Sequence, residues 1–177
     1  WVFVLGVINA EAGDGGIGQI VLGSAIFVLG SLLGASLAVV APGQTKVVQF
    51  FGRYIGTVRK TGLRMVVPLT TRRTVSVRVH NFETHELKVN DADGNPVNIA
   101  AIVVWQVADT AKATFAVEEY EDFVAVQSES ALRHVAMSHP YDNAVTEVTL
   151  RGDTEIISAE LAAEVAERIA LAGLEVI

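Results

Sequence analysis

The chain has 177 residues, of which 51% are hydrophobic, and its formal net charge is −7 at pH 7. It contains no cysteine, which excludes disulfide frameworks, thiol nucleophiles and thiolate metal sites. No acidic residue lies between Asp14 and Glu83, where eight basic residues occur, whereas eighteen acidic and only five basic residues follow Asn81. This asymmetry predicts a basic surface that faces a charged partner.

The first forty residues are dominated by apolar side chains. Residues 17–41 carry no charge, and a bilayer core needs about 20 apolar residues in one helix. We therefore predict a transmembrane helix over 17–41; a buried core helix of a soluble protein is the alternative. Residues 1–10 are apolar but too short to span, and they are interpreted as the tail of an earlier membrane segment, or alternatively as an interfacial stub. Residues 11–16 then form a polar loop.

The predicted membrane segment and its flank supply the candidate site residues. Small residues recur every four positions at Gly30, Gly34 and Ala38, a spacing that favours close helix–helix packing. Basic residues close to a membrane helix stay cytoplasmic and attract anionic lipid. The sequence therefore predicts a cytoplasmic domain at the plasma membrane, whose lipid headgroup contacts come from Lys46, Arg53, Arg59, Lys60 and Arg64.

The first part of the domain at 42–177 reads as short strands. Residues 45–52 and 64–67 end at a glycine and a proline, and residues 74–82 alternate apolar and polar side chains. Residues 96–107 are apolar on both faces, which predicts one long buried strand. The Asp93-Gly94 dipeptide predicts a β-hairpin turn before it.

The second part of the domain reads as helices. Asp109 can cap a short helix, residues 118–139 carry an apolar stripe that ends before Pro140, and Asp153 can cap a further helix that stops near Gly173. Residues 174–177 predict a last strand. This order predicts an α+β fold, with an N-terminal transmembrane helix before a mixed sheet and helices.

Several passages of the domain resemble the SPFH or band 7 family, which includes stomatins, prohibitins and flotillins. The stretch APGQTKVVQFFGRYIGTVRKTGLRMVVPL is similar to the opening of these domains, at Gly52, Arg53, Gly62, Leu63 and Pro68. The passage DADGNPVNIAAIVVWQVADTAKATF resembles the family's turn and long apolar strand. A helix with Gln127, Ser128, Ala131, Leu132 and Arg133, and the closing LAAEVAERIALAGLEVI, are also similar.

The resemblance implies a bacterial band 7 domain over 42–177 that forms a large homo-oligomer at the membrane. It implies a non-enzymatic scaffold that organises membrane proteins, such as proteases, channels and respiratory complexes, and the surrounding lipid bilayer. The family usually carries a coiled coil after the domain, and none is present in this sequence. The alternatives are an accessory subunit bound to one membrane enzyme complex and a membrane-tethered enzyme.

The sequence offers no set of residues for catalysis, for a cofactor or for a metal. The four histidines lack metal-binding spacing: His134 and His139 are five apart on a predicted helix, and His80 and His85 are separated by an odd number of residues. They are interpreted as surface or capping residues. The basic stretch adjoins the membrane segment and the remaining domain is acidic, so nucleic acid is not expected as a partner.

Overall fold

The computed structural model describes residues 16–142 and 148–177 of the chain. These residues form two compact units. The N-terminal unit contains residues 16–42 and 48–72, and the C-terminal unit contains 43–47, 73–142 and 148–177. The apolar segment at 1–10 and nearly all of the polar loop predicted at 11–16 lie outside the described residues.

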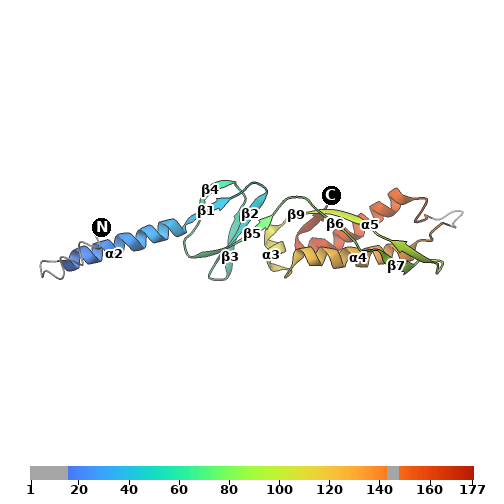
Figure 1. The fold of residues 1–177 in the computed structure, drawn as a ribbon, viewed down its shortest axis with the longest axis horizontal. Coiled ribbons are helices and arrows are strands. Elements are labelled where there is room, and N and C mark those ends of the chain that lie inside the picture. Colours follow the sequence, from blue (N-terminus) through green and yellow to red (C-terminus); the bar gives the residue numbers. More distant parts are fainter. Residues whose placement is uncertain (1–15, 143–147) are drawn as a thin grey trace. The chain divides into compact units, whose positions relative to one another are not determined.

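The N-terminal unit begins with helix α2, which covers Gly16–Ala35 (Figure 1). Ser36 closes its last turn, because the Ser36 hydroxyl donates to the carbonyl oxygen of Leu33 at 2.7 Å. Strand β1 (Leu37–Val40) follows, so the helix predicted over 17–41 is wrong over its last residues. Among the described residues, no helix reaches the combined length and hydropathy required of a membrane span.

Tertiary pairing explains the early end of the helix. The short apolar sequence at 37–40 is compatible with a helix or with a strand, and periodicity cannot separate the two in so short a run. Strand β1 pairs antiparallel with β4 (Gly62–Met65), which places Leu37 opposite Met65 and Val40 opposite Gly62. A partner distant in sequence thus decides the conformation of β1.

The second sheet contains β2 (Gln44–Phe50), β3 (Arg53–Val58) and β5 (Thr70–Ser76) in the order β3-β2-β5. The strand predicted over 45–52 is confirmed as β2. The alternating stretch predicted as one strand over 74–82 divides between β5 and β6 (His80–Glu83).

In the C-terminal unit, the predicted Asp-Gly hairpin is confirmed as β7 (Leu87–Asn90) and β8 (Pro96–Ile99), which pair antiparallel. Asp91 fixes the turn by accepting from the backbone N–H of Asn95 at 2.7 Å and from its side-chain amide at 3.1 Å. Gly94 has a φ of 85°, which favours glycine.

The single strand predicted over 96–107 is wrong, because the chain breaks it at Ala100 and Ala101. Strand β8 ends at Ile99, and β9 (Ile102–Val107) starts a different sheet with the order β10-β9-β6. Two hydrogen bonds from Thr84 stabilise the backbone at this break. The Thr84 N–H donates to the carbonyl oxygen of Ala101, and the Thr84 hydroxyl accepts from the Ala101 N–H, both at 2.9 Å.

The helices follow in the predicted order. Asp109 caps α3 (Thr110–Phe115) by accepting from the N–H groups of Ala111 and Lys112. Helix α4 (Tyr120–Ser138) ends before Pro140, and α5 (Thr154–Ile169) continues into the 3-10 helix η1 (Ala170–Ala172). Gly173, at φ 70°, then leads into β10 (Leu174–Val176), so the last predicted strand is confirmed.

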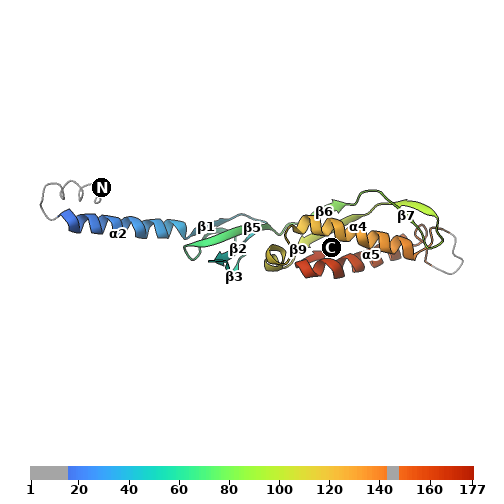
Figure 2. The ribbon, with the colours of Figure 1, turned by 90° about the horizontal axis from the view of Figure 1, so that it is seen from below.

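The core of the C-terminal unit lies between the β10-β9-β6 sheet and its helices, with α4 and α5 side by side (Figure 2). Trp105 is at its centre, stacked on His80 at a ring-centroid distance of 4.8 Å and edge-on to Tyr120 at 6.0 Å. Buried residues of β9, α4 and α5 surround it: Val103, Val107, Val124, Ala131, Val165 and Ile169. The predicted α+β class is therefore confirmed.

Candidate interaction surfaces

The paired strands β1 and β4 carry an exposed apolar face on the N-terminal unit. Directly opposed residues of an antiparallel pair point to the same face, and the register opposes Leu37 to Met65 and Val39 to Leu63. These four side chains, called the β1–β4 face below, are between 47% and 73% exposed. Ala38 and Val40 point to the other face and are buried. An apolar face of this kind marks an interaction site more often than a plain surface.

An apolar groove of about 380 Å³ continues this surface onto helix α2. It lies between the last turns of the helix and the residues that follow β4. Its lining consists of Leu29, Leu32, Leu33, Ser36, Met65, Val66, Val67 and Pro68. Because Met65 belongs to both, the groove and the β1–β4 face form one apolar surface next to an apolar helix.

Four of the five predicted lipid contacts are exposed residues of the same unit. Arg53 starts β3, Arg59 and Lys60 lie together in the connection from β3 to β4, and Arg64 is on β4 opposite Ala38. None of the four makes an ion pair within the described residues. The described part of this unit has no acidic residue, so the four charges are not neutralised locally. Lys46 is different, because it is half-buried on β2 and belongs to the C-terminal unit.

The predicted helix-packing stripe is corrected at one position. Gly30 and Gly34 are exposed on α2, and no atom lies within 4 Å of the space that a Cβ would occupy at either glycine. Ala38 is on β1 and buried, so it cannot continue a helical face. Packing of another helix against Gly30 and Gly34 remains a prediction.

Arg72 has a role that the sequence did not indicate. Its guanidinium donates to the carbonyl oxygen of Ala35 at 2.5 Å and to that of Leu37 at 2.7 Å. The last carbonyl groups of a helix lack partners within the helix and carry partial negative charge, so a cation there is stabilising. Arg72 therefore ties the end of α2 to the start of β1.

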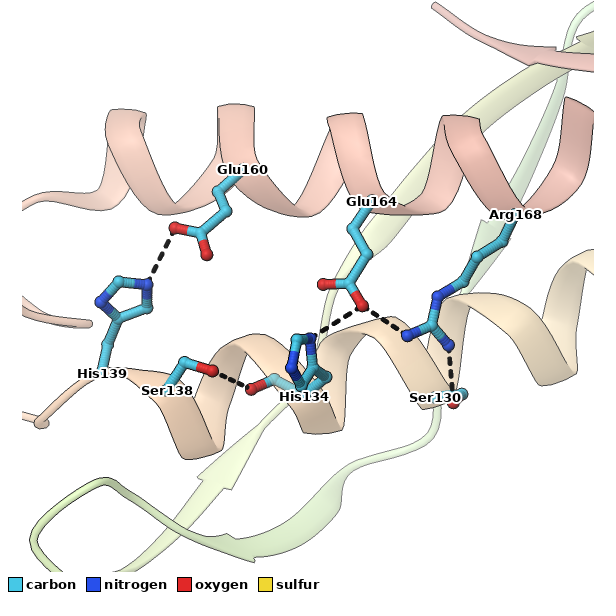
Figure 3. A network of polar contacts seen from close by, with 7 residues as sticks. All are labelled: Ser130, His134, Ser138, His139, Glu160, Glu164 and Arg168. Carbon is cyan, nitrogen blue, oxygen red and sulfur yellow. Dashed lines mark hydrogen bonds and ion pairs between the residues drawn. The ribbon is translucent and has the colours of Figure 1, made fainter.

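In the C-terminal unit, polar contacts join α4 to α5 (Figure 3). His134 contacts Glu164 at 2.9 Å, and His139, the residue that ends α4, contacts Glu160 at 2.8 Å. Arg168 binds Glu164 and donates to the hydroxyl of Ser130 at 2.8 Å. These contacts lie at the seam between the two helices, and they account for two of the four histidines.

Glu164 is the charged centre of this network. Burial alone would raise the pKa of its carboxyl group, but hydrogen bonds from His134 and Arg168 outweigh burial, and the pKa is lowered from its ordinary value of 4.5. The Glu164 carboxylate therefore stays ionised and binds both His134 and Arg168. Across the two ranges that the structure describes, no cluster of three or more histidine, aspartate or glutamate side chains is placed to bind a metal.

We expect Glu164→Gln to destabilise the α4–α5 pair at neutral pH more than at low pH. A carboxyl group with a lowered folded-state pKa contributes stability above its unfolded-state pKa, and that contribution is lost as the pH falls through the folded-state value. The difference between wild type and variant should therefore shrink as the pH falls below about 4.5. Hydrogen exchange of the α5 amides at several pH values measures it.

Glu167→Gln is the matched control for this prediction, because Glu167 is an exposed residue of the same helix. Its effect should be small at every pH. An equal effect of Glu164→Gln at neutral and at acidic pH would contradict the assignment of Glu164 as the charged centre.

Taken together, these features define an α+β domain that follows an apolar helix and bears an apolar and basic surface. The model of the SPFH domain / Band 7 family matches residues 38–177, and the chain therefore belongs to this family. Proteins of this family are membrane-associated and generally non-enzymatic. No curated protein matches the chain.

Proposed function

We propose that this chain is a non-enzymatic subunit of a membrane scaffold. In this proposal, the N-terminal helix anchors the chain in the plasma membrane and the N-terminal unit lies against the lipid headgroups on the cytoplasmic side. Copies assemble into a large homo-oligomer that organises or regulates membrane proteins, such as proteases, channels and respiratory complexes, and the local lipid.

The β1–β4 face is the observation that carries this proposal. Four large apolar side chains are exposed on a two-stranded sheet that begins immediately after an apolar helix. Each large aliphatic side chain moved from water into an apolar layer contributes about 1.5–3 kcal/mol. A bilayer that surrounds α2 can also cover this face and the groove beside it.

The charges support the same placement. Arg53, Arg59, Lys60 and Arg64 are exposed on the N-terminal unit without acidic neighbours in its described part. Basic residues near an anionic bilayer contribute about 1 kcal/mol each. Support for a membrane-crossing helix comes from the uncharged, apolar sequence at 17–41, and support for the cytoplasmic side comes from the basic residues that follow it.

A fluorescent probe on the β1–β4 face tests this placement. The chain has no cysteine, so Leu63→Cys creates a single labelling position for an environment-sensitive dye. In phosphatidylcholine vesicles that contain phosphatidylglycerol, we expect this probe to show blue-shifted emission and protection from aqueous iodide. The Leu63 side chain is exposed in the isolated chain, and in the proposed placement lipid covers it and excludes iodide.

Ala92→Cys serves as the control, because Ala92 is an exposed residue of the β7–β8 hairpin turn in the C-terminal unit, which the proposal does not place against the bilayer. Its probe should remain more accessible to iodide than the probe at position 63. If iodide quenches both positions equally in vesicles, the placement of this face against the bilayer is wrong.

A further inference from the structure

The turn between β2 and β3 has an unusual combination of backbone and side chain. Phe50 ends β2 and Arg53 starts β3, so Phe51 and Gly52 form a two-residue hairpin loop. Their φ values are 46° and 83°, and positive φ at both central residues defines a type I′ turn. Asn-Gly is strongly preferred in such turns, because asparagine tolerates the left-handed conformation. Here a phenylalanine occupies the asparagine position.

This phenylalanine has no burial to compensate for its strained backbone. Phe51 is 82% exposed, the highest value among the large hydrophobic residues that the structure describes. Its ring packs edge-on against Phe50 at a centroid distance of 4.7 Å. A bulky residue at positive φ is a genuine outlier, and such outliers concentrate at functional sites.

The same combination occurs once more in the same unit. Leu69, in the connection from β4 to β5, has a φ of 63° and is 66% exposed. Phe51 and Leu69 are the two non-glycine residues with positive φ in the described chain, and both are large, apolar and exposed. The intrinsic preference of the backbone would place glycine or asparagine at both positions.

The residues around the β2–β3 turn identify the chemistry of its partner. Arg53 follows the turn directly, Tyr54 is half exposed beside it, and the described part of the unit has no acidic residue. Aromatic rings together with arginine are characteristic of the interfacial layer of a bilayer, where an apolar ring meets anionic headgroups. An anionic bilayer offers both complements at one depth, because its apolar boundary accepts the ring and its phosphates bind the guanidinium.

We propose that the β2–β3 turn is a lipid-insertion point, at which Phe51 enters the interfacial layer of an anionic phospholipid bilayer while Arg53 contacts the headgroups. This inference rests on the proposed membrane placement of the N-terminal unit and adds a second contact to the β1–β4 face. In this proposal, the contact between the Phe51 ring and lipid explains why a strained phenylalanine occupies a position that favours asparagine or glycine.

Single-cysteine labelling of the full chain in vesicles tests this inference. The Phe51→Cys variant carries an environment-sensitive dye, and Ala92→Cys is the control because Ala92 is an exposed residue of the β7–β8 hairpin turn. The vesicles contain phosphatidylcholine and phosphatidylglycerol, with nitroxide-labelled lipid as a shallow quencher. We expect several-fold weaker iodide quenching at position 51 than at position 92, and nitroxide quenching at position 51 only.

Each other outcome has a defined meaning. Equal iodide quenching at positions 51 and 92 overturns the inference, and so does protection at position 51 without nitroxide quenching, because protein would then cover the turn. A probe at Leu63→Cys that is protected while position 51 is not overturns only the insertion point and leaves the proposed function in place. Loss of protection at both positions 51 and 63 contradicts the two proposals together.

A second variant separates insertion from a structural role. Phe51→Asn restores the preferred residue of a type I′ turn, so we expect its thermal unfolding temperature in detergent to be higher than that of the wild type. Its paired effect should be a loss of vesicle-induced protection at a probe placed at Ile55→Cys, an exposed position of β3 that has no role in the proposed contact. Phe50→Asn is the matched control and should not stabilise the chain, because Phe50 does not have positive φ. An unfolding temperature lowered by Phe51→Asn would mean that the ring is needed for folding, which overturns the inference.

Discussion

Trp105→Ala is expected to destabilise the C-terminal unit by about 3–5 kcal/mol, the range typical of removing a large aromatic side chain from a core. Trp105 is buried on the central strand of the β10-β9-β6 sheet. It stacks on His80 and meets Tyr120 edge-on, so its removal would leave a cavity between sheet and helix. Urea unfolding followed by hydrogen exchange of the α4 amides measures the change.

Trp105→Phe is the matched control. The indole Nε1 of Trp105 is buried without a hydrogen-bond partner in the described chain, so phenylalanine sacrifices no hydrogen bond and keeps a ring in the core. Its cost should be less than half of the cost of Trp105→Ala. Equal costs for the two variants would show that ring packing is not what Trp105 contributes.

Arg72→Ala should weaken the junction between α2 and β1 by about 1.5–3 kcal/mol, the range for hydrogen bonds that involve a charged group. Its guanidinium bridges the carbonyl oxygens of Ala35 and Leu37. Without this bridge, the C-terminal end of the helix keeps unpaired carbonyl groups and loses a favourable cation. We expect faster hydrogen exchange in the last turn of α2, at the Ser36 amide that donates to Leu32 and Leu33.

The control for this junction is Arg72→Lys. Lysine retains the charge but lacks the planar fork that reaches two carbonyl oxygens at once, so it should recover only part of the protection. Arg73→Ala, a neighbouring exposed arginine, should leave exchange at Ser36 unchanged. If Arg72→Ala does not accelerate exchange there, the bridge does not stabilise the end of α2.

The sequence predicted those elements whose signals are local. Asp109 caps α3, Pro140 follows the end of α4, and the Asp-Gly turn forms a hairpin, because each depends on the chemistry of a few adjacent residues. The errors arose where distant pairing decides the structure. The sequence predicts a helix at residues 37–40, because the pairing of β1 with β4 has no signature in these residues. The break at Ala100 and Ala101 depends on Thr84, which is far away in sequence.

The surface of the N-terminal unit was predicted in part. Charge alone identified Arg53, Arg59, Lys60 and Arg64, which are exposed as expected. The β1–β4 face was not found, because apolar residues in short strands are ordinarily interpreted as buried. Phe51 and Arg72 could not be found either, since backbone strain and a bond to a distant carbonyl group appear only in three dimensions.

The most direct test of the proposed scaffold function is to extract the protein with mild detergent from the membranes of cells that express it. The native mass and the subunit composition of the extracted particle are then measured. The account predicts a very large particle composed of many copies of this chain. A small particle that contains one or two copies among the subunits of another membrane complex would contradict it, and would instead identify the chain as an accessory subunit of that complex.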